Sequence, residues 1–476
     1  MFALESHLNV KLIEPLKIAI TEGLNSKALE QGHKILSRLG EAIPSNPTQE
    51  ALEQHIEQTQ SLIRGVSEND ILNCRLMTDN IKLAAMKFLA QLESVTIMVE
   101  PALHPFVTLK MFFGLSPVSP IGFVYFGSLL AKRGNIRVGL RFTLLAKALL
   151  NKLEASEIAG EVICVATEVL CFVEPVQSSR ELLLIQGESA AMAGGDIHSA
   201  CMNRLQYCSM MFWTYSELSV VDDTFSEACR FMRENQHRTT LFFILMWQKT
   251  ILTLKGSEPE ASELSRNIHE SNNPHNDGML KEYAETFFKL NKSSWFLHFG
   301  EAGQALILGL VSFELYRATQ DSLWLERGKK YSSDMKLWAT QGSIWNFQHK
   351  QLLLEAEEHY SIGRFEDAQL SYKNAITFAR SHKFVNDEAL ACELAAKFYW
   401  GTSSLVSSLE HFRLAHEKYI QWGALSKAGR LFASINQKFS NVLDDNSALL
   451  SRIVSESVVV NSQSSDETGP PKRRMV

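Results

Sequence analysis

The fold is decided by one stretch, Leu352–Tyr399, which reads LLLEAEEHYSIGRFEDAQLSYKNAITFARSHKFVNDEALACELAAKFY. Apolar residues recur there every three or four positions. This spacing predicts one helix up to Gly363, a second helix after it, a break near Phe384 and a third helix. Small residues recur where neighbouring helices would touch, and large apolar residues fill the spaces between them. The small residues are Ala356, Gly363, Ala368, Ala375, Ala391 and Ala395, and the large ones are Leu352, Tyr360, Phe365, Leu370, Tyr372 and Phe378.

This pattern resembles the tetratricopeptide repeat, a helix–turn–helix unit of about 34 residues that stacks on copies of itself. Elsewhere in the chain the apolar spacing is also helical, and alternation with a period of two is never sustained. We therefore expect an all-α protein, an α-solenoid of stacked helix–turn–helix pairs with about twenty helices and no sheet.

A six-residue turn motif links this stretch to earlier parts of the chain. In Gly363-Arg-Phe365-Glu-Asp-Ala368, the glycine is expected to end a helix in a left-handed turn. The third residue is expected to fill the layer between helices, and the sixth to lie where two helices cross. Further copies of the motif are Gly134–Gly139, Gly195–Ala200 and Gly300–Ala305, with a fainter one at Gly23–Ala28. Because these copies are unevenly spaced along the chain, we expect helix pairs with a degenerate motif between them.

Composition excludes several classes of protein. The chain has 476 residues, 45% of them hydrophobic and 21% charged, which is typical of a soluble globular protein. The net charge of −6 argues against a nucleic-acid surface or a polybasic membrane contact. No apolar run approaches the roughly 20 residues of a spanning helix, and Glu5 interrupts the first apolar run, so no secretory signal is recognised. We expect a soluble, cytoplasmic protein with neither nucleic acid nor membrane as a partner.

The seven cysteines are odd in number and scattered singly. They are therefore interpreted as buried free thiols in a reducing compartment, in preference to disulfides or metal ligands.

The chain is expected to divide into three parts. Residues 1–115 form N-terminal helical repeats, 116–440 a tetratricopeptide-like array, and 441–476 a polar tail expected to be disordered. Prolines between Pro101 and Pro120 predict a joint of short helices that change direction, with a domain boundary as the alternative. A nuclear address at Lys472–Arg474 is the alternative to a solvated basic tail.

Several segments resemble one family of large multi-domain signalling proteins. These proteins join a serine/threonine kinase-like domain, an AAA-type ATPase, a long tetratricopeptide-like region and sensor and histidine-kinase domains. The resemblance covers about residues 15–440 and implies a role in signal transduction, in which the helices link an ATPase switch to an output. The segments are Ala28–Pro44, Leu72–Leu89, Ser116–Leu153, Asp387–Tyr399 and Ala415–Leu431.

The catalytic motifs of that family are missing from the sequence. A phosphate-binding loop at Gly328-Lys329-Lys330 would need glycine at Leu323 and Ser or Thr at Lys330. The box His269–Pro274 is similar to a histidine-kinase acceptor site but lacks the surrounding apolar helix, so it is interpreted as a loop cap. No H-R-D or D-F-G motif and no histidine spacing typical of a metal site is present.

We therefore predict a protein that is not an enzyme and that holds no cofactor or metal. Its predicted role is a scaffold that mediates protein–protein interaction in signal transduction. One alternative is a helical module of a larger ATPase or kinase protein whose catalytic domains lie outside this chain. A small-molecule sensor with an apolar pocket near Phe212–Trp247 is a further alternative.

A partner groove is expected on the concave face of the C-terminal repeats. The helix before Gly363 would present Lys350, Leu353, Glu357 and Tyr360 to this groove. Leu353 and Glu357 stand where chaperone-binding tetratricopeptide domains carry a carboxylate clamp, so a hydrophobic or basic helical segment is the expected guest. The run Glu355, Glu357 and Glu358 is interpreted as a solvated helix face. The expected partners are protein segments or neighbouring signalling domains.

Overall fold

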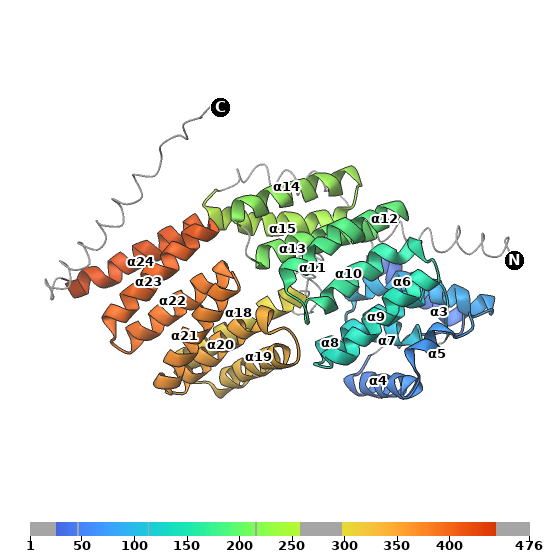
Figure 1. Ribbon diagram of the computed structural model, residues 1–476, viewed down its shortest axis with the longest axis horizontal. Helices are drawn as coiled ribbons and strands as arrows, with labels where there is room; N and C mark the ends of the chain where they lie inside the picture. The colour runs from blue at the N-terminus through green and yellow to red at the C-terminus, as the bar shows by residue number, and fades with distance from the viewer. Residues whose placement is uncertain (1–24, 45–46, 113, 215–216, 258–297, 444–476) are drawn as a thin grey trace, which may run out of the picture.

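The computed structural model describes residues 25–44, 47–112, 114–214, 217–257 and 298–443 (Figure 1). Within them every regular element is a helix, and the sole β contact is an isolated bridge between Leu76 and Leu115. The prediction of an all-α protein without a sheet is confirmed. The α-helices are α3 (Asn25–Arg38), α4 (Gln49–Ile63), α5 (Glu68–Leu72), α6 (Asn80–Val99), α7 (His104–Lys110), α8 (Ser119–Lys132), α9 (Ile136–Lys152), α10 (Ala159–Leu170), α11 (Val176–Leu182), α12 (Ser189–Ala193), α13 (Ile197–Trp213), α14 (Leu218–Glu234), α15 (Arg238–Lys255), α18 (His298–Thr319), α19 (Ser322–Gln341), α20 (Ile344–Ser361), α21 (Phe365–Ser381), α22 (Val385–Gly401), α23 (Leu405–Trp422) and α24 (Leu425–Leu443).

Helices that follow one another along the chain pack side by side, as in a repeat array (Figure 1). The strongest pairs are α8–α9, α18–α19, α20–α21 and α22–α23. The first helices of successive pairs also touch, because α18 packs on α20 and α20 on α22. This layering is consistent with a helical repeat.

Half of these α-helices end in the same turn. Gly134, Gly195 and Gly363 have φ values of +87°, +73° and +79°, the left-handed conformation that glycine adopts without strain. The residue after each glycine donates its backbone N–H to a carbonyl five positions earlier, at 2.8–2.9 Å. This is the Schellman motif, which satisfies carbonyls at a helix end. Three of the four predicted turn glycines therefore end helices as expected.

The same turn also occurs without glycine, where the sequence motif could not detect it. Gln236, Lys383 and Ser403 have φ values of 54°, 62° and 60°, and the next residue makes the same backbone bond. The helix–turn–helix repeat therefore continues through α14–α15 and α21–α23, where residues other than glycine adopt the left-handed turn. This explains the uneven spacing of the glycine copies.

The sixth positions of the three confirmed motifs lie at helix contacts. Gly139, Ala200 and Ala368 are buried. A Cβ atom at Gly139 would collide with the backbone oxygen of Gly127 and the backbone nitrogen of Ala131, so α8 and α9 approach closely only because residue 139 is glycine. The third position is less regular, since Ile136 is buried whereas Phe365 is 50% exposed.

The fourth predicted copy, Gly300–Ala305, is wrong as a turn. Gly300 lies inside α18, which runs without a break from His298 to Thr319. The surrounding sequence keeps its helical apolar spacing, and one glycine costs a helix only about 1 kcal/mol. Ala305 is buried, but within a continuous helix. Gly23 of the fainter copy lies outside the described residues.

The apolar core links distant parts of the chain. One cluster joins buried residues from Ala28 to Ala166, and another extends from Ala131 to Phe439. The proline-rich joint contains the seven-residue helix α7, followed by α8 with Pro120 in its first turn. The boundaries at residues 115 and 440 stay predictions. The box His269–Pro274 and the basic run Lys472–Arg474 lie outside the described residues.

In the part of the chain that the structure describes, no helix is both long and apolar enough to cross a membrane. Of the seven cysteines, Cys74 is exposed and the other six are buried, and all are free thiols.

Candidate functional site

The candidate site is the inner side of the C-terminal array, where the partner groove was expected. Two of its predicted residues, Lys350 and Glu357, are only 1% and 2% exposed. Tyr360, the third, is half-buried under the guanidinium of Arg317, whose carbon lies 4.6 Å from the ring centre. The prediction that Lys350 and Glu357 face an open groove is wrong, because both side chains are buried in ion pairs within the chain.

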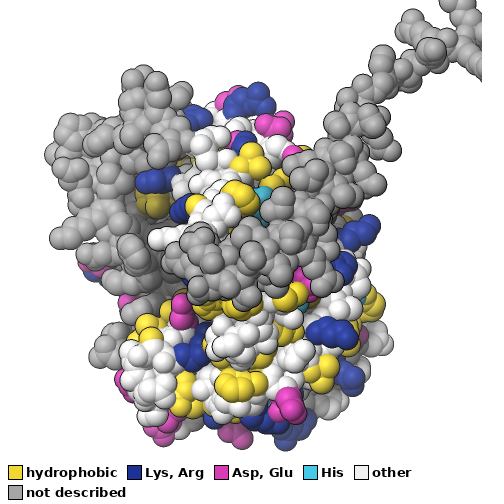
Figure 2. All heavy atoms as spheres, turned by 90° about the vertical axis from the view of Figure 1, so that its left-hand side faces the viewer, with side chains coloured by type: hydrophobic (Ala, Val, Ile, Leu, Met, Phe, Trp, Pro, Cys, Tyr) yellow, Lys and Arg dark blue, Asp and Glu magenta, His cyan; other side chains and the backbone are white. Residues whose placement is uncertain are grey.

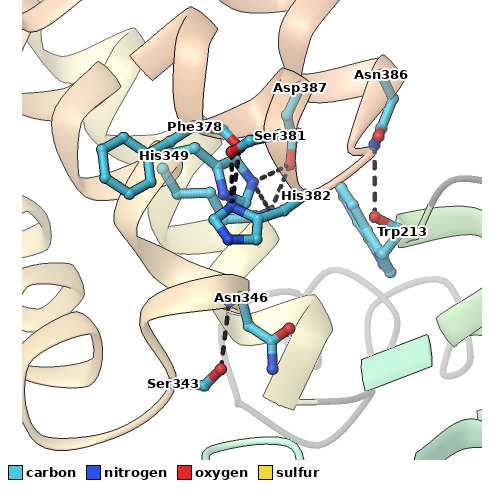
Figure 3. A network of polar contacts seen from close by, with 10 residues as sticks. Trp213, Ser343, Asn346, His349, Phe378, Ser381, His382, Asn386 and Asp387 are labelled. Carbon is cyan, nitrogen blue, oxygen red and sulfur yellow. Dashed lines mark hydrogen bonds and ion pairs between the residues drawn. The ribbon is translucent and has the colours of Figure 1, made fainter. Parts of the chain in front are cut away.

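Lys350 belongs to a buried cluster between α20 and α22 that includes His349 and Asp387, the two members labelled in Figure 3. Its ammonium contacts Oδ2 of Asp387, and the Nε2–H of His349 donates to the same oxygen at 2.8 Å. Phe384, just before α22, stacks on His349 with ring centres 4.5 Å apart and lies 4.6 Å from the Lys350 ammonium. The charged pair is therefore buried next to the stacked rings of His349 and Phe384.

The cluster fixes the charge state of its members. Burial alone would raise the pKa of Asp387, but the Lys350 charge and the His349 hydrogen bond lower it to about 2. Burial, together with the Lys350 charge, lowers the pKa of His349 to about 4. At neutral pH the site therefore holds the Asp387 carboxylate, in contact with Lys350, and a neutral His349 imidazole.

Glu357 closes a second ion pair, between α18 and α20. Arg317 donates from Nη2 to Glu357 Oε2 at 2.7 Å and from Nη1 to the Ser361 hydroxyl at 2.9 Å. The hydroxyl of Tyr372 on α21 donates to the other carboxylate oxygen. The expectation that Glu357 belongs to a solvated helix face is therefore wrong.

A third pair joins α22 to α24. Glu393 accepts from Tyr419 at 2.8 Å and contacts Lys427 at 2.8 Å and Lys397 at 3.0 Å. As with Glu357, the carboxylate also accepts a hydrogen bond from a tyrosine on the second helix of the same pair. We call the contacts Arg317–Glu357, Lys350–Asp387 and Glu393–Lys427 the inner ion-pair ladder, since each joins the first helices of successive pairs.

The chain itself covers the ends of α20 and α22 next to this ladder. Asn346, at the start of α20, donates to the carbonyls of Cys171 and Glu174 at 2.8 and 2.7 Å and accepts from the N–H of Val176 at 3.3 Å. In Figure 3, Asn386 points toward the Trp213 backbone, to which its amide donates at 3.5 Å. Residues from the first half of the chain thus pack against the starts of α20 and α22, the two helices that the Lys350–Asp387 pair joins.

A separate buried acidic cluster lies in the N-terminal half, where no sequence pattern predicted it. Burial raises the pKa of Glu93 well above its ordinary value and that of Glu161 to about 8. Thr108 donates to Glu93 at 3.1 Å, and Tyr125 donates to Glu161 at 3.1 Å. His104 Nδ1 lies 2.7 Å from Glu93, and burial lowers the pKa of its ring to about 3.

The described residues contain no group of three or more His, Cys, Asp or Glu placed to hold a metal ion. The buried ion pairs described above instead join one helix to another.

Comparison with known proteins adds no family. The sequence matches no family model, and no curated protein is significantly similar to it.

Proposed function

We propose that the protein is a non-catalytic helical-repeat scaffold that mediates protein–protein interaction. The observation that carries this proposal is the array of consecutively packed helix pairs, because such arrays offer an extended surface to partners. The inner ion-pair ladder supports it, since buried pairs between successive layers fix how those layers are oriented.

The partner surface of this proposal lies on the outside of the array. On the face that Figure 2 shows, which is the left-hand side of Figure 1, hydrophobic side chains are exposed among basic and acidic ones. At the turn between α20 and α21, for example, Ile362 is 41% and Phe365 50% exposed, and Leu370 on α21 is 58% exposed. Apolar side chains ringed by polar ones are a frequent composition for protein interfaces.

The segments that resemble signalling ATPase–kinase proteins extend the proposal to signal transduction, with signalling domains as partners. This part rests on the resemblance alone.

An affinity purification of the full chain followed by quantitative mass spectrometry tests the scaffold proposal. We expect partners that remain bound at physiological salt and that co-migrate with the protein in size-exclusion chromatography. A protein that migrates as a lone monomer from every extract contradicts the proposal. So does ATP turnover by the purified chain that a substitution of Asp387 abolishes without unfolding the protein.

A further inference from the structure

The helix α9 has an unusual distribution of charge. It carries Arg137, Arg141, Lys147 and Lys152 and no acidic residue, in a chain whose net charge is −6. Its buried face consists of apolar residues such as Phe142 and Leu149. Arg137, Leu144 and Lys147 are spaced to share the opposite face, and Leu144 is 51% exposed. The outer face of α9 is therefore both basic and apolar.

Contacts within the chain show which groups these cations bind. Arg141 Nε donates to Glu68 Oε1 of α5 at 3.0 Å, and Lys152 donates to Asn73 Oδ1 at 3.1 Å. Arg133, just before α9, pairs with Glu53 of α4. Acidic and polar side chains of the α4–α5 segment therefore already bind the cations along one side of α9.

The remaining cations of this face, Arg137 and Lys147, make no ion pair and no hydrogen bond within the part of the chain that the structure describes. On the inner side of the array, by contrast, the cations of the ion-pair ladder are all neutralised by carboxylates. The two free cations flank the exposed Leu144 on one helical face.

We propose that the outer face of α9, formed by Arg137, Leu144 and Lys147 with Arg141 at its edge, docks an acidic amphipathic helix of a partner protein. This inference rests on the proposed scaffold function and assigns it a surface and a partner class. Arg137 and Lys147 are ten residues apart, about 15 Å along the helix axis at 1.5 Å per residue. A helix lying along α9 matches this spacing with a carboxylate at each end and an apolar side chain over Leu144.

A helical partner fits this face better than nucleic acid or a lipid surface does. Binding to nucleic acid rests on many contacts with backbone phosphates. This face offers two cations beside Leu144, Arg137 and Lys147, that are unpaired among the described residues. Stable binding to anionic lipid likewise needs a larger basic cluster.

The test uses the full-length protein and a fluorescent synthetic peptide of about 20 residues, with leucines at helical i, i+3, i+4 and i+7 spacing and glutamates beside them. We expect saturable binding, measured by fluorescence anisotropy, that weakens as salt is raised. The double variant Arg137→Glu/Lys147→Glu should weaken binding at least about tenfold, as attraction becomes repulsion. Circular dichroism checks that the fold is kept.

The control is Lys329→Glu/Lys330→Glu on α19, which reverses the same charge at two exposed positions, whereas in the α9 variant Arg137 is exposed and Lys147 half-buried. It should leave peptide binding unchanged, and a peptide with glutamine in place of glutamate should not bind. Equal weakening by both double variants overturns the proposal, as does binding of a DNA duplex or anionic vesicles with the same dependence on Arg137 and Lys147.

The affinity purification separates this inference from the scaffold proposal. If the α9 variant loses a partner that the α19 variant keeps, the assignment is supported. If both variants keep the same partners, α9 is not the docking surface and the scaffold proposal stands.

Discussion

At the scale of single residues, the charged side chains Lys350 and Glu357 of α20 lie in the same buried stripe as its apolar ones. Phe347, Lys350, Leu354 and Glu357 recur every three or four residues, so they share one helical face. Phe347 and Leu354 are buried, and the two charged residues are buried with them. Their place in an apolar stripe was a sign of burial in the sequence, but the partners Asp387 and Arg317 lie 37 and 40 residues away.

The substitution Asp387→Asn should destabilise the protein by about 3 kcal/mol, because it leaves the Lys350 ammonium buried without a counter-charge. Urea denaturation measures the change. Asp367→Asn is the matched control, since Asp367 pairs with Arg364 at an exposed position and should cost less than about 1 kcal/mol. The double variant Lys350→Met/Asp387→Asn should recover part of the loss. Equal effects of the two single variants would contradict the role of burial.

The imidazole of His237 should make stability fall in mild acid. Its Nδ1 accepts from the Thr240 backbone at the start of α15, and its Nε2–H donates to His198 Nδ1 at 3.0 Å. Burial and the neighbouring His198 lower the pKa of His237 to about 3. The neutral ring therefore contributes stability above the unfolded pKa of about 6.5, and this contribution is lost as pH falls toward 3.

His237→Asn tests this, because asparagine keeps the helix cap and removes the titration. Between about pH 7.5 and pH 5.5 the wild type should lose about 1 kcal/mol more than the variant. The comparison uses the difference between the two proteins, since the raised pKa values of Glu93 and Glu161 act in the opposite direction in both. The same substitution at the exposed His55 serves as control. Parallel pH profiles for the wild type and His237→Asn would contradict the expectation.

At the scale of helices and turns, the repeat is defined by a backbone conformation more than by a residue type. Glycine adopts the left-handed turn most easily, which is why Gly134, Gly195 and Gly363 revealed it. Lys383 and Ser403 adopt it at a cost that tertiary packing offsets, so the turn at Lys383 was recognised in the sequence only as a break near Phe384.

Gly363→Val should lower stability by about 1–2 kcal/mol through backbone strain alone. Its φ is +79°, and no atom lies within 4 Å of the position that a Cβ would take. Gly363→Asn, which tolerates this conformation, should cost less. Thermal unfolding of the two variants measures the difference, and an unchanged melting temperature for Gly363→Val would count against the assigned turn.

Gly139→Ala should act by a different route. The added methyl group would meet the backbone of Gly127 and Ala131, so α8 and α9 must move apart. We expect a loss of about 2 kcal/mol or more, from overpacking at a backbone contact. Gly429→Ala, at an open position inside α24, is the control for the effect of a methyl group in a helix without a collision. If Gly139→Ala costs no more than Gly429→Ala, α8 and α9 do not approach as closely as described.

At the scale of the whole molecule, distant segments stabilise one another. Asn346 ties α20 to residues 171–176, which precede it by 170 or more positions. Gly423, at the end of α23, lies against Leu218 of α14. The array therefore packs against its own first half.

Asn346→Ala should loosen a segment far away in sequence, because it leaves two buried carbonyls and one N–H without their partner. We expect faster hydrogen exchange across residues 171–176, with a loss of stability of about 2 kcal/mol. Asn374→Ala, on α21, is a control outside this contact. Unchanged exchange at residues 171–176 would show that Asn346 does not hold the two parts together.

The sequence by itself determined the all-α class, the helix pairs and three turns, because helical spacing and glycine conformation act over a few residues. Only the tertiary structure decided that Gly300 continues a helix and that Lys350 and Glu357 are neutralised inside the chain. Their partners Asp387 and Arg317 are on other helices, and no local pattern records which helices will meet. The same limit hid the basic face of α9, where Arg137 and Lys147 have no ion-pair partner among the described residues, because the sequence does not show which cations will meet a carboxylate on another helix.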